Sequence, residues 1–139
     1  MGWFKKSRPK EVRAALGILD EIECTFHPNI YFFEHAFAIV RKKIEEVILG
    51  DPEDFVQIIQ GGRQPRQWIW SAIANVAGDH VESGEYHIYR GALNPLGPGK
   101  GLLALFDMAV DELVKLGCLT PEVGQQQKSA VRSNIADVG

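Results

Sequence analysis

The chain has 139 residues, of which 45% are hydrophobic and 24% charged, and its formal net charge is −3. A chain of this size and composition can form one domain whose core needs neither disulfides nor metal. The net charge makes nucleic acid an unfavoured partner, and we expect no transmembrane segment because no apolar run is long enough to cross a bilayer.

The charges are unevenly distributed, because the first residues are basic and the stretch over 14–62 is mostly acidic. We expect residues 1–8 to be a flexible basic segment and residues 9–139 to form a single helical domain. The basic start and the acidic body should attract each other or attract different partners.

Aromatic residues stand beside cations in the basic segment. Trp3 and Phe4 directly precede Lys5 and Lys6. This combination suits an acidic partner or a membrane surface, which residues 3–10 would contact weakly and in a salt-sensitive way.

Three amphipathic helices are predicted, over about 9–24, over about 30–49, and over a short stretch that begins at 52. Apolar residues recur in them at spacings of three and four. The expected core residues of the first two are Val12, Leu16, Leu19, Ile22, Phe33, Phe37, Val40, Ile44 and Val47. The third has the clearest start, because Asp51 can cap it and Pro52 suits its first position.

The segment over about 65–82 is apolar on nearly every side, which predicts a helix surrounded by other helices. One polar line interrupts it at spacings of three and four, and consists of Gln67, Ser71, Asn75, Gly78 and Glu82. We therefore expect this segment to be the central helix. The polar line should face a cleft, an interface or a narrow exposed seam.

Residues 85–90 alternate between apolar and polar and are rich in tyrosine, which predicts a short extended or β segment. Residues 91–101 contain four glycines and two prolines and predict a loop. A fifth helix should follow to about 116, with Leu116 inward and Asp107, Asp111 and Lys115 on a solvated face. Gly117 should end it, and a weakly apolar sixth helix should begin at Thr120-Pro121 and dock lightly.

The predicted fold class is therefore mainly α. We expect a compact single-domain bundle of about five or six helices, with one short extended or β segment near 85–90.

The loop before the fifth helix has some features of a phosphate-binding loop. Gly99-Lys100-Gly101 would offer backbone N–H groups and a cation at a helix start. The nucleotide-binding pattern G-x-x-x-x-G-K-[ST] fails, however, because Asn94 replaces its first glycine and Gly101 replaces its hydroxyl residue. Casual anion binding stays open, and a hinge is the simpler interpretation.

If a small ligand or anion binds, we expect it in a cleft between the central helix and the loop over 91–101. The candidate residues for this site are Ser71, Asn75, His87, Arg90 and Lys100. His87 has the side chain to act there as an acid or a base.

We predict no metal site, no cofactor and no catalytic residue. Neighbouring Glu34 and His35 point apart on a helix, where metal ligands would need spacings of three or four. Cys24 and Cys118 stand in apolar contexts and far apart, so we expect two small buried side chains in a reducing cytoplasm.

These features favour a small cytosolic, non-enzymatic interaction or regulatory protein that contacts a partner protein or a second copy. The candidate interaction surface consists of Trp3, Phe4, Lys5, Lys6, Tyr31 and Phe32. The first alternative is a small-ligand or anion-binding protein, or even an enzyme, that uses the cleft between 65–82 and 91–101. The second is a weak binder of nucleic acid or acidic surfaces through its basic N-terminus.

Overall fold

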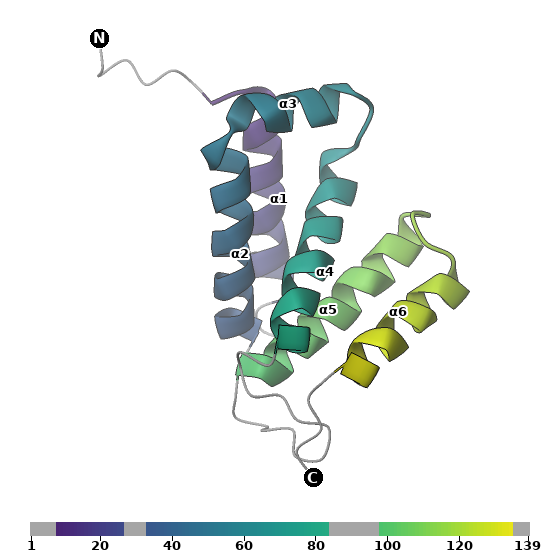
Figure 1. The fold of residues 1–139 in the computed structure, drawn as a ribbon. Coiled ribbons are helices and arrows are strands. Elements are labelled where there is room, and N and C mark those ends of the chain that lie inside the picture. The colour runs from purple at the N-terminus through teal and green to yellow at the C-terminus, as the bar shows by residue number, and fades with distance from the viewer. Residues whose placement is uncertain (1–7, 27–32, 84–97, 135–139) are drawn as a thin grey trace.

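The structure, a computed structural model, describes residues 8–26, 33–83 and 98–134 (Figure 1). Helices account for most of these residues, and no strand occurs among them. The helices are α1 (Lys10–Phe26), α2 (Phe33–Gly50), α3 (Pro52–Gln60), α4 (Pro65–Ser83), α5 (Pro98–Lys115) and α6 (Pro121–Asn134). The mainly α prediction is confirmed, whereas the extended segment predicted at 85–90 lies outside the described residues.

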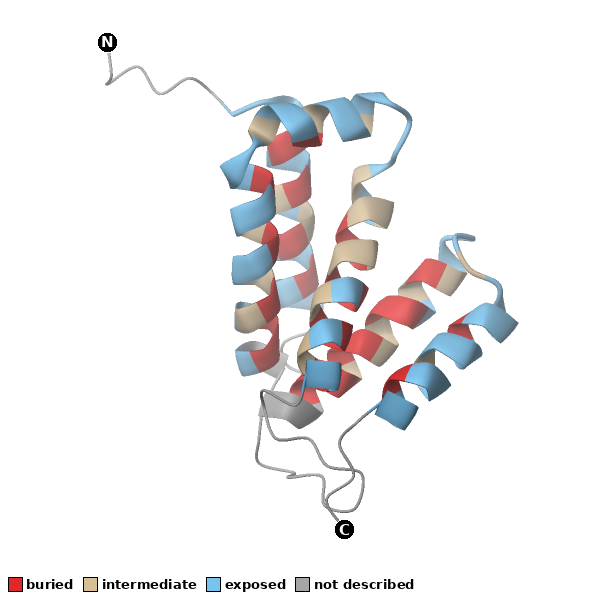
Figure 2. Ribbon diagram, viewed as in Figure 1, coloured by how far each residue is buried: buried red, intermediate tan, exposed pale blue. Residues whose placement is uncertain are grey.

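The helix predicted to be central is α4, which contacts α1, α2, α5 and α6. In Figure 1, α1 and α2 stand together, α3 crosses one end of the bundle, and α6 lies against α5 on the far side. The buried residues face one another across this arrangement (Figure 2). Because neighbours surround α4, its apolar residues are covered on most of its circumference.

The core is built from apolar side chains of every helix. Those exposed by 2% or less include Val12, Ala15, Leu19, Ile22, Phe37, Val40, Ile44, Ile48, Ile69, Trp70, Ile73, Leu102 and Leu105. Each large side chain of this kind stabilises the fold by roughly 1.5–3 kcal/mol relative to an exposed position. At one end, Phe55 of α3 meets Trp68 of α4 edge-on, with ring centroids 4.8 Å apart.

Two residues predicted to face the core are exposed instead. Val47 is 58% exposed and Leu116 is 37% exposed. In α2, Ile48 takes the buried position, because residues 37 and 48 are separated by about three full turns and therefore share a face. Leu116 directly follows Lys115, the last residue of α5, and Figure 1 shows that this end of α5 lies away from α2.

The expectation of two buried cysteines is wrong. Cys24 and Cys118 are free thiols and both are exposed. Cys24 follows the buried Leu19 by five positions, which rotates it to the opposite side of α1. Cys118 lies in the turn between α5 and α6.

The predicted helix ends are formed by local hydrogen bonds. The Asp51 side chain accepts from the Asp54 backbone N–H at 3.1 Å and caps α3. At the predicted end of α5, Gly117 has a φ of 80° and follows the helix. Its N–H donates to Val114 at 3.0 Å and that of Cys118 donates to Leu113 at 2.9 Å, which is the Schellman arrangement.

The loop prediction for 91–101 is wrong at its C-terminal end. Helix α5 begins at Pro98, so Gly99-Lys100-Gly101 forms part of its first turn. Proline suits this position because it lacks the N–H that a first-turn residue leaves unbonded. Gly101 is buried, so the predicted loop is shorter than expected and this stretch is part of the helix.

Candidate functional site

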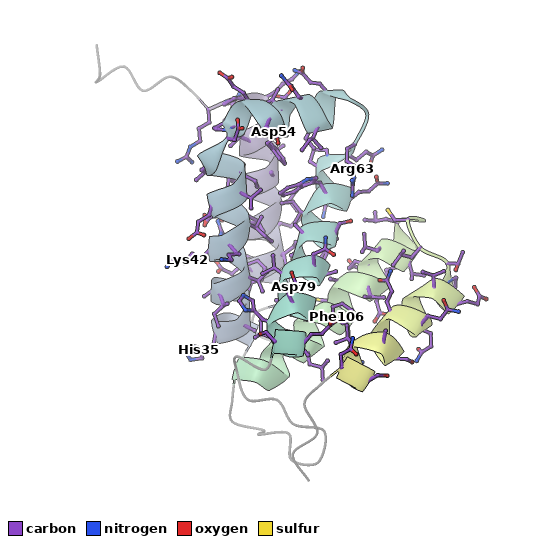
Figure 3. All side chains as sticks on the ribbon, in the orientation of Figure 1. His35, Lys42, Asp54, Arg63, Asp79 and Phe106 are labelled. Carbon is purple, nitrogen blue, oxygen red and sulfur yellow. The ribbon has the colours of Figure 1, made fainter. Side chains whose placement is uncertain are left out.

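A groove lies between α4 and α6, with α5 beneath it. It has a volume of about 250 Å³. We call it the α4–α6 groove, and the residues that define it are Ala74, Asn75, Gly78, Asp79, Glu82, Phe106, Gln127, Ala130 and Val131. Figure 3 shows Phe106 and Asp79 at the end of the bundle where these three helices meet. The lower half of the predicted polar line, from Asn75 to Glu82, therefore faces the seam with α6.

The floor of the groove is apolar because α4 and α5 approach closely there. Phe106 and Val131 are each 5% exposed. A Cβ built on Gly78 would lie 3.2 Å from Cε1 and 3.3 Å from Cδ1 of Phe106. Gly78 thus leaves room for the Phe106 ring, which lines the bottom of the groove.

The rim is polar and carries negative charge. Asn75, Asp79 and Glu82 on α4 and Gln127 on α6 are all exposed. Asn134 donates to Glu82 through Nδ2 at 3.3 Å. Within the part of the chain that the structure describes, neither Asp79 nor Glu82 has a cationic partner.

The opposite edge of α6 is neutralised by ion pairs to α5. Arg132 donates to both carboxylate oxygens of Asp107, at 3.0 and 2.6 Å, and Lys128 donates to Asp111 at 2.6 Å. The hydrogen bond that Arg132 donates to Asp107 raises the pKa of Arg132 above its ordinary value, against the opposing effect of partial burial. Asp107 and Asp111 therefore seat α6 on α5, which corrects their predicted place on a purely solvated face.

Lys115, four positions after Asp111, pairs with Glu112 at 3.1 Å. Side chains three positions apart on a helix lie close together, so Glu112 can pair with Lys115. Asp111 is thereby left to accept from Lys128 of α6.

One acidic residue of the rim, Glu82, stands where the local field of α4 disfavours a carboxylate. Glu82 lies in the last turn of α4 and Asp79 lies just before it. A carboxylate near the negative end of a helix dipole is destabilising by about 0.3–1 kcal/mol when exposed. Departures of this kind from local preference are expected where residues serve a functional role.

The structure describes only some residues of the ligand site predicted from the sequence. Asn75 lines the α4–α6 groove, and Ser71 lies one turn away, where Arg63 donates to its Oγ at 3.5 Å. His87, Arg90 and the Lys100 side chain lie outside the described residues, as does the predicted surface formed by Trp3, Phe4, Lys5, Lys6, Tyr31 and Phe32.

Sequence reasoning did not select Phe106, Gln127 or Val131, which come from helices other than α4. Gly78 stood in the predicted polar line, but a glycine inside a helix does not by itself reveal a close neighbour, since Gly17 of α1 has nothing within 4 Å.

A second hollow of about 500 Å³ lies on the outer face of α2. Its central cation, Arg41, bonds to Asp20 at 2.6 Å and lies 3.4 Å from Glu45 and 3.6 Å from Glu23. Because these carboxylates already satisfy the guanidinium, this cluster is a structural link between α1 and α2.

Among the described residues, no group of three or more His, Cys, Asp or Glu side chains is arranged to hold a metal ion. Nor is any helix in these residues both long and apolar enough to span a membrane. Comparisons with models of protein families, with curated proteins and with solved structures found no match.

Proposed function

We propose that this protein is a non-enzymatic interaction protein that binds a segment of a partner protein in the α4–α6 groove. The observation that carries the proposal is an apolar floor beneath a rim that bears the carboxylates of Asp79 and Glu82. The complementary ligand places an apolar side chain beside a cation, as a protein segment containing Lys or Arg does.

The size of the groove favours a protein segment over an enclosed small molecule. Its volume of about 250 Å³ falls below the roughly 300–1,000 Å³ of pockets that enclose drug-sized ligands. An anchoring side chain on an apolar floor, surrounded by a polar rim, is typical of protein interfaces. The amides of Asn75, Gln127 and Asn134 could both donate to and accept from a bound peptide backbone.

The proposed location is the cytosol. Cys24 and Cys118 are exposed free thiols, and a reducing compartment keeps such thiols from forming disulfides.

The test uses three synthetic peptides that differ only in charge or aromatic content. They are acetyl-Gly-Trp-Lys-Lys-Gly-amide, the same peptide with two Glu in place of Lys, and the same peptide with Ala in place of Trp. We expect the first to shift the NMR amide signals of Asn75, Gly78 and Val131. The other two should bind about tenfold more weakly or worse, because each lacks one half of the required chemistry.

A matched pair of charge reversals locates the binding. Asp79→Lys should weaken binding of the Trp-Lys-Lys peptide about tenfold. Glu46→Lys makes the same charge change at an exposed position in the second hollow and should alter binding less than about twofold, because Debye screening limits its reach. Equal loss in both variants, or equal binding of the Glu-containing peptide, would contradict the proposal.

A further inference from the structure

The chain itself contains a segment with the chemistry that the α4–α6 groove requires. Residues 3–8 read Trp-Phe-Lys-Lys-Ser-Arg, so two aromatic side chains adjoin three cations. The groove offers the apolar floor at Phe106 and Val131 for an aromatic ring. Its rim offers the carboxylates of Asp79 and Glu82, which have no cationic partner among the described residues, to the lysines.

We propose that residues 3–8 of one copy of this chain bind in the α4–α6 groove of a second copy. The inference rests on the proposed function and names the occupant of the same groove. It also gives a role to the contrast between the basic start of the chain and its acidic body, because opposite charges on two copies attract each other.

The dimensions of the bundle favour a second copy over the chain's own N-terminus. Helices α1 and α4 begin at the same end of the bundle (Figure 1), where Gln60 at the end of α3 donates to Glu11 at 3.2 Å. Gly78 lies thirteen positions along α4, or about 20 Å from its start. Trp3 is only five positions from Arg8, about 17 Å at full extension. The segment therefore falls short of the groove of its own chain, even before the lateral distance is added.

Association through this contact has two predictable properties. It should weaken as salt is added, because the pairs between lysines and carboxylates are at an exposed rim. If both copies exchange their segments, the second contact forms within an existing complex and the pair closes as a dimer.

The experiment is sedimentation velocity on the full chain over a wide concentration range. We expect the wild-type chain to associate as concentration rises. The segment variant Lys5→Glu/Lys6→Glu and the groove variant Asp79→Lys/Glu82→Lys should each shift this association to about tenfold higher concentration or more.

Mixing the two variants should restore association, because the reversed segment of one is complementary to the reversed groove of the other. The matched control is Lys42→Glu/Lys43→Glu, a pair of adjacent exposed lysines on α2. This control should associate as the wild-type chain does.

Two results would overturn the inference: a wild-type chain that stays monomeric at millimolar concentration, or association that the groove variant leaves unchanged. If the Trp-Lys-Lys peptide still binds in either case, the proposed function stands and only the occupant is wrong. If that peptide also fails to bind, both proposals are overturned.

Discussion

Reversing the acidic rim should stabilise the fold while it removes binding. In Asp79→Lys/Glu82→Lys, two carboxylates near the negative end of α4 become cations. At Glu82 the reversal removes an unfavourable dipole interaction and adds a favourable one, each worth about 0.3–1 kcal/mol. The lost Asn134 hydrogen bond, at 3.3 Å and exposed, subtracts roughly 0.5 kcal/mol.

The net expectation is a gain of about 1 kcal/mol in the free energy of unfolding, which for a domain of this size corresponds to roughly 3–5 °C in Tm. Thermal unfolding followed by circular dichroism measures it, and the gain should shrink as salt is added. The control Glu46→Lys lies outside the last turn of α2, as Asp79 lies outside that of α4, and should change stability by less than about 0.5 kcal/mol.

The combined outcome is decisive because loss of binding through unfolding would lower Tm. A variant that is more stable and no longer binds the Trp-Lys-Lys peptide shows that the carboxylates serve binding at a cost to stability. A fall in Tm of several degrees would refute the electrostatic reasoning, and unchanged binding would refute the role of the rim.

Two further predictions concern packing and pH. Gly124→Ala should lower the free energy of unfolding by about 1–3 kcal/mol, because its Cβ would lie 2.9 Å from Val114 Cγ2. Gly17→Ala, with nothing within 4 Å of the added Cβ, should raise it by about 0.5–1 kcal/mol. Denaturant unfolding of both variants distinguishes crowding from helix propensity, and equal effects would contradict the close α5–α6 packing. A hydrogen bond from a backbone N–H, and to a smaller extent the one from Gln60, lowers the pKa of Glu11. This carboxylate therefore stabilises the fold above its unfolded pKa of about 4.3, and that stability is lost as pH falls through the lower folded value. Glu11→Gln should therefore flatten the acid limb of a plot of stability against pH, and an unchanged slope there would show that Glu11 carries no such linkage.

The sequence predicted individual helices well because their signals are local. The Asp51 cap and Gly117 at the end of α5 depend on side chains and backbone angles within a few residues. The central place of α4 followed from its apolar circumference, since such a helix must be covered on most sides.

The errors arose where a neighbouring helix decides the outcome. Val47 lies close to the apolar stripe of α2 but is 58% exposed, while the adjacent Ile48 is buried, because the positions of the neighbouring helices decide which residues at that end are covered. Asp107 and Asp111 looked like a solvated pair because periodicity gives an angle around α5 and does not reveal the cations of α6 opposite them.

The sequence by itself determined the helix boundaries at Asp51 and Gly117, the burial of most stripe residues and the polar line along α4, because hydrogen bonding and periodicity act within one helix. Only the tertiary structure decided which part of that line became a groove. Its floor needs Phe106 and Val131 from two other helices. Its carboxylates have no cationic partner among the described residues, because Lys128 and Arg132 of α6 bond to α5. The site therefore depends on the rotation of α6, which no single helix of the chain encodes.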